Sequence, residues 1–256
     1  MRDQNNQSRR SFIQKIAAAG AGSIASTKYL NAMPETNSFA GDKGNNAIVL
    51  FQGDSITDGN RSRNDDWNHV MGHGYAYLVA SRLGYEQPGK NFHFYNRGVS
   101  GNKITDLAAR WQKDTMDLKP DVLSILVGVN DVNSVFEGTD PVDAKKFEDV
   151  YRSLLKQTKE TLPGIQIVLC EPFLYPMIRA SEKWVPEIKI RQSIVRNLSN
   201  EFNAIFIPLQ DAFNAMLEKA PATYWIWDGV HPMPAGHELI ARKWISIVKK
   251  TLYYIA

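Results

Sequence analysis

Short apolar runs alternate along this chain with longer segments in which apolar residues recur every three or four positions. The short runs predict buried strands, and the longer segments predict helices that place one face on a core. The strands are expected at residues 47–52, 92–96, 122–127, 165–170 and 204–208. The helices are expected at residues 75–83, 103–112, 141–162, 186–202 and 234–252. Alternation of this kind implies an α/β protein whose parallel sheet is covered by helices on both sides.

Four short polar blocks stand out against this pattern. They read GDSITDGN from Gly53, NRGVSGN from Asn96, GVND from Gly128 and DGVHP from Asp228. The first three each follow a predicted strand, and the fourth precedes the last helix. In open parallel sheets ligands bind outside the carboxyl ends of the strands. We therefore expect the first three blocks to meet at one edge of the sheet.

Together the blocks contain the groups needed for acyl transfer to water. Ser55 is a hydroxyl nucleophile, His231 a base suited to neutral pH, and Asp228 a carboxylate that orients the base. The Ser55 N–H, Gly98 and Asn130 are candidate donors to an oxyanion. Three of these residues also have a purely structural interpretation: Ser55 as a helix cap, Gly98 as a turn glycine and Asn130 as a turn residue.

The neighbouring acids Asp54, Asp58 and Asp131 are interpreted as structural. Asp54 and Asp131 are expected to brace the loops that carry Ser55 and Asn130, and Asp58 to act as a cap or turn residue.

In these blocks the chain resembles the SGNH subgroup of the GDSL esterases and lipases, named after one Ser, Gly, Asn and His. The four map onto Ser55, Gly98, Asn130 and His231, and the resemblance spans roughly residues 47–247. Ile56 stands where the name-giving motif has Leu. The resemblance implies a flavodoxin-like, three-layer α/β/α sandwich with a parallel five-stranded sheet, and a serine esterase that needs no cofactor and no metal.

The N-terminus carries its own signal. The stretch Ser8-Arg9-Arg10-Ser11-Phe12-Ile13-Gln14-Lys15 resembles a twin-arginine export signal, and the weakly apolar stretch after it is too short to span a bilayer. The alternative is a disordered basic tail. Residues 1–40 are interpreted as signal peptide and linker, and 41–256 as a single SGNH hydrolase domain. Export would place the protein in the periplasm or outside the cell.

Composition and charge add exclusions. The formal net charge of +3 comes from residues 1–40, and the rest of the chain has equal numbers of basic and acidic residues. It therefore gives no reason to expect nucleic acid or an anionic membrane surface as partner, and no stable membrane insertion is expected. Cys170 is the only cysteine, so no internal disulfide can form, and it is interpreted as a small buried hydrophobic residue.

Several histidines and aromatic residues remain. His69 and His73 have the i, i+4 spacing of zinc ligands but lack the Glu of the zinc protease motif, so they are not assigned to a metal. Trp111 and Trp244 are assigned to the core. The aromatic residues in or near loops are candidates for substrate contacts, although loop packing is the commoner role: Trp67, Phe173, Tyr175, Trp225 and Trp227.

The resemblance and the export signal together favour hydrolysis of O-acetyl groups on carbohydrates. The expected partner is then a small-molecule or oligosaccharide ester. One alternative is a lysophospholipase or thioesterase with the same chemistry. Another is a carbohydrate-binding protein without activity, against which the intact Ser, Gly, Asn, Asp and His argue.

Overall fold

The computed structural model of the chain describes residues 45–64, 68–138, 140–252 and 255. The twin-arginine segment and Trp67 lie outside these described residues. None of the helices in the described part is long and apolar enough to cross a membrane.

Five parallel strands form one sheet in the order β2-β1-β3-β4-β5. Their bounds are β1 Ile48–Gly53, β2 His93–Asn96, β3 Val122–Leu126, β4 Gln166–Cys170 and β5 Ile205–Ile207. This is the strand order of flavodoxin-like folds, in which the chain reverses direction across the sheet next to β1. The predicted fold is therefore confirmed.

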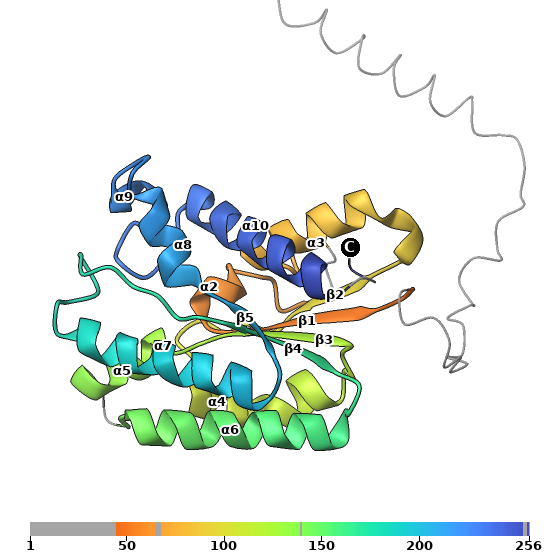
Figure 1. Cartoon of the computed structure of the whole chain (residues 1–256), viewed down its shortest axis with the longest axis horizontal. Coiled ribbons are helices and arrows are strands. Elements are labelled where there is room, and N and C mark those ends of the chain that lie inside the picture. Colours follow the sequence, from red (N-terminus) through yellow and green to blue (C-terminus); the bar gives the residue numbers. More distant parts are fainter. Residues whose placement is uncertain (1–44, 65–67, 139, 253–254, 256) are drawn as a thin grey trace, which may run out of the picture. The chain divides into compact units, whose positions relative to one another are not determined.

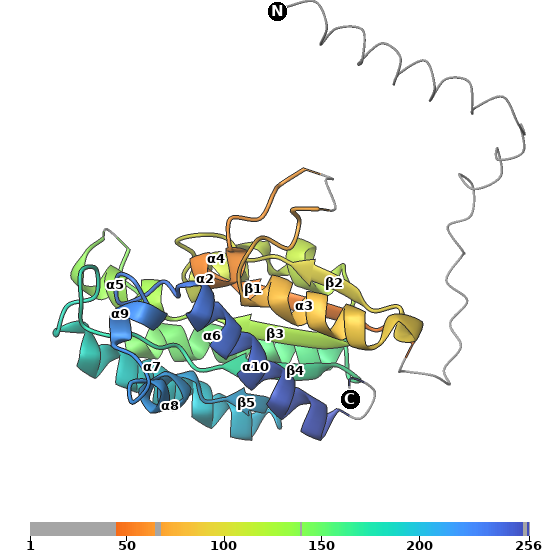
Figure 2. The same ribbon diagram turned by 90° about the horizontal axis from the view of Figure 1, so that it is seen from above.

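Helices cover both faces of the sheet (Figure 1). One face carries α3 Tyr75–Glu86, α8 Leu209–Met216 and α10 Pro234–Thr251. The other carries α4 Ile104–Trp111, α5 Val129–Phe136, α6 Ala144–Thr161 and α7 Trp184–Glu201. Figure 2 shows α3 and α10 lying together over the strands. The result is the three-layer α/β/α sandwich that the alternating pattern predicts.

Both faces of the central strands are buried. In β1, Phe51 faces α3 and α10, where its ring lies 5.7 Å from that of Trp244. Its neighbour Leu50 belongs to the core on the opposite face, together with Trp111 of α4. Because adjacent side chains of a strand point to opposite faces, a continuous apolar run is what such a strand requires. Trp111 and Trp244 are both core residues, as predicted.

The one polar residue inside β3 has a partner. The Trp244 Nε1–H donates to Ser124 Oγ at 3.0 Å, so a buried indole and a buried hydroxyl satisfy each other. Cys170 lies in β4 on the same face and is fully buried, and burial raises the pKa of its thiol to about 12. Its assignment as a buried hydrophobic residue is confirmed.

Some element boundaries differ from the predicted ones. The helix expected from residue 141 begins at Ala144, because the Asp143 side chain accepts from the Lys146 N–H at 2.8 Å and caps the helix there. Four further helices had no prediction: α2 Ser55–Asp58, α5, α8 and α9 Ala222–Trp225. They are four to eight residues long, so an apolar period spans at most about two turns in each. The described residues also include a 3₁₀ turn, η1 Pro88–Lys90, and a π-helical turn, η2 Gln112–Met116.

Candidate active site

Ser55 is the first residue of α2, directly after β1. Asp54 caps this short helix through a hydrogen bond from the Ile56 N–H to its Oδ1 at 3.0 Å. Gly53 makes the sharp turn possible, because a Cβ at this position would lie 2.2 Å from the Leu126 carbonyl oxygen. The turn leaves Ser55 partly exposed while both its neighbours are buried.

His231 and Asp228 reach Ser55 from the loop before α10. Ser55 Oγ lies 2.9 Å from His231 Nε2, and His231 Nδ1 lies 2.6 Å from Asp228 Oδ2. With the proton on Nδ1, the imidazole donates to the carboxylate and its Nε2 can accept the serine proton. The three side chains thus form one hydrogen-bonded series.

The loop around Asp228 is held by its own hydrogen bonds. Asp228 Oδ1 accepts from the Val230 N–H at 2.9 Å and from the His231 N–H at 2.7 Å. Burial opposes ionisation of this carboxyl, but the hydrogen bonds from His231 and Val230 outweigh it and lower the pKa of Asp228. Asp228 is therefore a carboxylate at neutral pH, with its second oxygen free to hold the imidazole.

Gly98 lies beside the Ser55 turn. Beyond the end of β2 the pairing with β1 continues, and the Val99 N–H donates to the Gly53 carbonyl at 3.0 Å. Gly98 then packs so closely on α2 that a Cβ would lie 2.3 Å from the Asp58 nitrogen. The glycine is thus required by a close approach of two backbone segments, and not by a positive φ. Its N–H donates to Asn96 Oδ1 at 2.9 Å.

Asn130 lies in the first turn of α5, just beyond β3. Its Nδ2 donates to the Asn102 carbonyl at 3.2 Å, which ties the third block to the second. An amide nitrogen carries two hydrogens, so this bond leaves one of them for another acceptor. The adjacent Asp131 braces the same junction, because its Oδ1 accepts from the Ile104 N–H at 2.9 Å.

Two buried acids lie under this edge of the sheet. Burial raises the pKa of Asp54 to about 7, and the nearby charge of Asp131 adds to the effect. Burial also raises the pKa of Asp131 to about 7. Among the described residues, Asp131 Oδ2 has no hydrogen-bond partner. Each acid accepts a backbone N–H, so their interpretation as braces agrees with the contacts.

Asn96 was missed by the sequence reasoning, although it opens the second block. Its buried Nδ2 donates to the carbonyls of Thr57 at 2.7 Å and Met71 at 2.9 Å, while its Oδ1 accepts from Gly98. One side chain therefore joins α2, the loop before α3 and the Gly98 turn. An asparagine at the end of a strand gave no signal of these long-range contacts.

Two arginines were also missed. Arg61 Nε donates to the Gly98 carbonyl at 3.0 Å, and burial lowers the pKa of Arg61 to about 10. Arg110, on α4, donates to the Arg97 carbonyl at 2.7 Å. Asp58 accepts from the Arg61 and Ser100 N–H groups and pairs with Arg63, so it is the turn residue that was expected.

The aromatic residues that were candidates for substrate contacts differ in exposure and in distance from His231. Trp227 is 52% exposed, and its ring lies 6.4 Å from the His231 ring at an interplanar angle of 26°. Tyr175 is half-buried and donates from its hydroxyl to Asn214 Oδ1 at 2.6 Å. Of the two, Trp227 is the one whose ring stacks on a residue of the Ser55 series.

The prediction that Phe173 and Trp225 contact substrate is wrong, because both side chains are buried. Phe173 is fully buried with its ring 4.6 Å from that of Phe213, and Trp225 is buried with Nε1–H donating to the Ala220 carbonyl. Phe173 follows the strand β4 and Trp225 precedes the DGVHP block, but both side chains pack into the core. Neither offers a surface to a substrate in this structure.

His237 is a packing residue. Its Nδ1 accepts from the Tyr75 N–H at 3.1 Å, and burial lowers its pKa to about 4. His93 is exposed at the edge of the sheet. Within the described residues, no group of three or more His, Cys, Asp or Glu side chains is placed to hold a metal ion.

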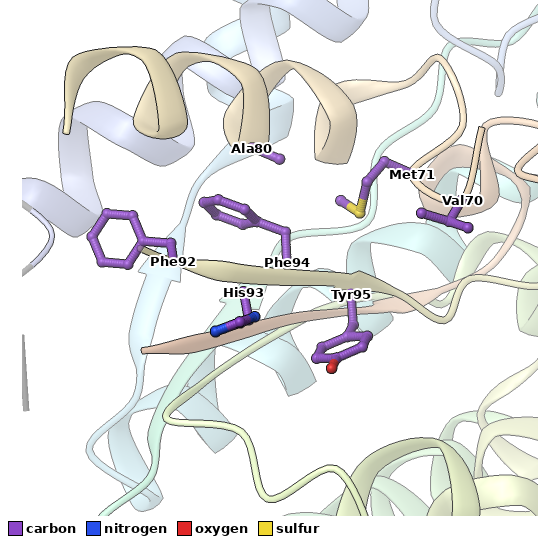
Figure 3. Close-up of a pocket in the computed structure, with 7 residues that line it drawn as sticks. All are labelled: Val70, Met71, Ala80, Phe92, His93, Phe94 and Tyr95. Atoms are coloured by element: carbon purple, nitrogen blue, oxygen red, sulfur yellow. The ribbon is translucent and has the colours of Figure 1, made fainter. Parts of the chain in front are cut away.

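A cavity of about 200 Å³ lies against the edge strand β2. Figure 3 shows Phe92 and Phe94 pointing toward Ala80 of α3, with His93 and Tyr95 on the other side of the strand. Its lining includes none of Ser55, Asp228 and His231. It is therefore not an acyl pocket attached to that series.

A serine hydroxyl, an imidazole and a carboxylate joined in this order, at the strand ends of a parallel sheet, are the arrangement found in α/β serine hydrolases. The family model of the GDSL-like lipase/acylhydrolase family matches residues 51–239. The chain therefore belongs to that family, and it is a carboxylic ester hydrolase.

Related proteins agree with this assignment. The acetylxylan esterase of Geobacillus stearothermophilus is 34% identical over 214 residues, which cover 79% of this chain and 94% of that protein. Its crystal structure has a TM-score of 0.72 at 32% identity, over 80% of this chain and 95% of that one. A Parabacteroides merdae protein described as a GDSL-like lipase has a TM-score of 0.76 at 42% identity, over 80% of this chain and 96% of its own.

Proposed function

We propose that this ester hydrolase removes O-acetyl groups from carbohydrates, with Ser55 as nucleophile, His231 as general base and Asp228 as its orienting partner. The observation that carries the mechanism is the series of contacts from Ser55 Oγ to His231 Nε2 at 2.9 Å and from His231 Nδ1 to Asp228 at 2.6 Å. It provides a route for the serine proton as the nucleophile attacks.

The reaction proceeds in two halves. Ser55 Oγ attacks the acetyl carbonyl while its proton passes to His231 Nε2. The tetrahedral intermediate collapses to acetyl-Ser55, and the sugar hydroxyl leaves with the proton from His231. Water, deprotonated by His231, then attacks the acetyl-enzyme, and acetate is released as His231 returns the proton to Ser55 Oγ. Throughout, the Asp228 carboxylate stabilises the imidazolium.

Three donors serve the oxyanion in this proposal. The Ser55 N–H is at the first position of α2, where backbone N–H groups have no partner within the helix. Asn130 contributes the amide hydrogen that Asn102 does not take. The Gly98 N–H is shared with Asn96 Oδ1, so its donation to substrate is bifurcated.

Two features support a carbohydrate ester as substrate. The acetylxylan esterase relative is similar over nearly its full length. The exposed Trp227 ring beside His231 suits the apolar face of a sugar. The reaction needs no cofactor in this proposal, because serine and histidine supply the nucleophile and the base.

The test is the Ser55→Ala variant, measured with 4-nitrophenyl acetate and with acetylated xylo-oligosaccharides. Activity on both should fall by at least about 10³-fold. Ser193→Ala, which removes an exposed hydroxyl on α7, is the matched control and should keep full activity. A folded Ser55→Ala protein with more than a tenth of wild-type turnover would disprove the nucleophile. Faster turnover of long-chain than of acetyl esters would favour the lysophospholipase or thioesterase alternative.

We also propose export by the twin-arginine route, which rests on Arg9-Arg10 and the segment after them. Replacing both arginines by lysine should leave the esterase in the cytoplasmic fraction of the host. Unchanged periplasmic activity in that variant would remove the proposal.

A further inference from the structure

Arg110 makes several contacts close to the proposed oxyanion donors, and it has no role in the proton transfers of ester hydrolysis. It lies near the end of α4, and its side chain is only 18% exposed. Its Nη1 donates to the Arg97 carbonyl at 2.7 Å and to Gln52 Oε1 at 2.9 Å, and pairs with Asp114 at 3.0 Å. Its Nε donates to Asn102 Oδ1 at 2.9 Å.

Apart from Asp114, these acceptors belong to segments that carry or hold the three proposed oxyanion donors. The Arg97 carbonyl is in the same peptide group as the Gly98 N–H. Asn102 is the residue whose own carbonyl accepts from Asn130 Nδ2. Arg110 Nη2 also approaches the Gly53 carbonyl at 3.4 Å, at the end of β1 just before Ser55.

A peptide group is planar, so a bond that holds its carbonyl also sets the direction of its N–H. A charged donor on that carbonyl withdraws electron density through the amide and makes the N–H a stronger donor. The Arg110 guanidinium at Arg97 therefore orients and polarises the Gly98 N–H. A planar fork can reach several acceptors at once, which a lysine ammonium cannot do in the same geometry.

The surroundings hold the fork in place. The π-helical turn η2 follows α4 and presents the Asp114 carbonyl and Thr115 Oγ1 to Gln52 Nε2, at 2.9 Å and 2.8 Å. With its nitrogen held there, Gln52 directs Oε1 to Arg110. Single π-turns are frequent at functional sites.

We propose that Arg110 is a positioning residue for the oxyanion hole, aligning the Arg97–Gly98 peptide and the Asn102 loop that holds Asn130. This inference rests on the proposed function, because it assigns a task to donors that function requires. Arg110 touches neither substrate nor Ser55 in this role; it acts through the donors.

Arg110→Lys keeps the positive charge and removes the planar guanidinium group with its several donors. We expect kcat for 4-nitrophenyl acetate to fall by about 10- to 100-fold, less than loss of a whole oxyanion donor, with KM changed less than about threefold. Arg152→Lys is the matched control: it also loses a multidentate guanidinium, bound to Glu148 and Glu201, and should keep wild-type kcat. In Arg110→Ala, added guanidinium ion should restore part of kcat, while sodium chloride at equal ionic strength should not.

A second variant decides the matter if Arg110 variants do not fold. Asn102→Ala removes the Arg110 Nε acceptor but keeps the backbone carbonyl that holds Asn130. We expect a fall in kcat of about three- to tenfold at unchanged KM.

The outcomes separate this inference from the proposed function. Wild-type kcat in folded Arg110→Lys and Asn102→Ala, while Ser55→Ala is inactive, would overturn the positioning role alone. A lower kcat in Arg110→Ala that added guanidinium ion does not restore would also count against the positioning role. Activity retained by Ser55→Ala would overturn the proposed function itself.

Discussion

Ser55 Oγ lies 2.9 Å from His231 Nε2, although 176 residues separate the two in the chain. The contact exists because β1 ends beside the loop that precedes α10, and because Asp228 holds the imidazole from the other side. Its geometry depends on one tautomer of His231, with the proton on Nδ1. Changes that reverse the tautomer should therefore abolish activity without changing the fold.

Asp228→Asn should make that reversal. Asp228 Oδ1 accepts two backbone N–H groups, so an asparagine would keep its oxygen there and turn its NH₂ toward His231 Nδ1. His231 would then carry its proton on Nε2 and could not accept from Ser55. We expect kcat to fall by about 10³- to 10⁴-fold, as for a triad aspartate in serine proteases. The exposed Asp211→Asn should be silent, and equal activities of the two variants would contradict the triad.

Asn130→Ala should lower kcat by about 10²- to 10³-fold with little change in KM, because the amide meets charge that develops only in the transition state. Asn130→Asp should be at least as damaging, since it places a carboxylate against that charge. Asn133→Ala, one turn further along α5, is the control. Normal kcat with a raised KM in Asn130→Ala would show that Asn130 binds the ground state instead.

Trp227→Ala tests the sugar contact. Its ring is half exposed beside His231, so its removal should raise KM for acetylated xylo-oligosaccharides by about tenfold, in keeping with the loss of one stacked ring. Turnover of 4-nitrophenyl acetate, which has no sugar, should change little. Tyr224→Ala removes a similarly exposed ring three residues away and serves as control. Equal losses on both substrates would place Trp227 in the catalytic geometry and not in sugar binding.

Gly98→Ala should destabilise the protein. The added Cβ would lie 2.3 Å from the Asp58 nitrogen and 2.8 Å from the Thr57 carbonyl carbon, and these backbone atoms of α2 leave no room for a small adjustment. We expect a loss of about 1–3 kcal/mol in the free energy of unfolding, measured by urea titration, together with lower kcat. Gly84→Ala is the contrast: its Cβ meets nothing within 4 Å inside α3 and should stabilise the fold by about 0.5–1 kcal/mol.

Asp131→Asn should alter the pH dependence of stability. Burial raises the pKa of Asp131 from 3.8 to about 7 in the folded protein, so the folded state binds this proton more tightly than the unfolded state does. Deprotonation of Asp131 should therefore lower the wild-type free energy of unfolding as the pH rises from about 4 to about 7. The amide does not titrate, and the variant should lose less stability over that range, by on the order of 4 kcal/mol. Parallel pH profiles for the two proteins would contradict this account.

The local pattern of the chain was sufficient for the order of its elements. Five apolar runs became the five strands, because a strand buried on both faces needs a continuous apolar run. The blocks after β1, β2 and β3 then had to meet at one edge, since all strands run parallel. Ser55, Gly98 and Asn130 could thus be placed together before any contact was known.

Four helices of four to eight residues, α2, α5, α8 and α9, were not predicted, although the eight-residue α4 was. An apolar period needs about two turns to be visible, and α2 and α5 form because of a capping aspartate or a preceding strand end. Their existence depends on contacts from other parts of the fold.

Side-chain direction was decided only by the tertiary structure. Phe173 and Trp227 both lie in loops near the motifs, yet one packs against Phe213 and the other faces solvent beside His231. Asn96 and Arg110 carry no local signal, because each binds groups in other elements of the fold: Asn96 the carbonyls of Thr57 and Met71, and Arg110 the Arg97 carbonyl and Gln52. The sequence by itself determined which chemical groups reach the strand ends. The packing of those segments determined which peptide planes and rotamers they adopt, because these depend on partners that no local pattern encodes.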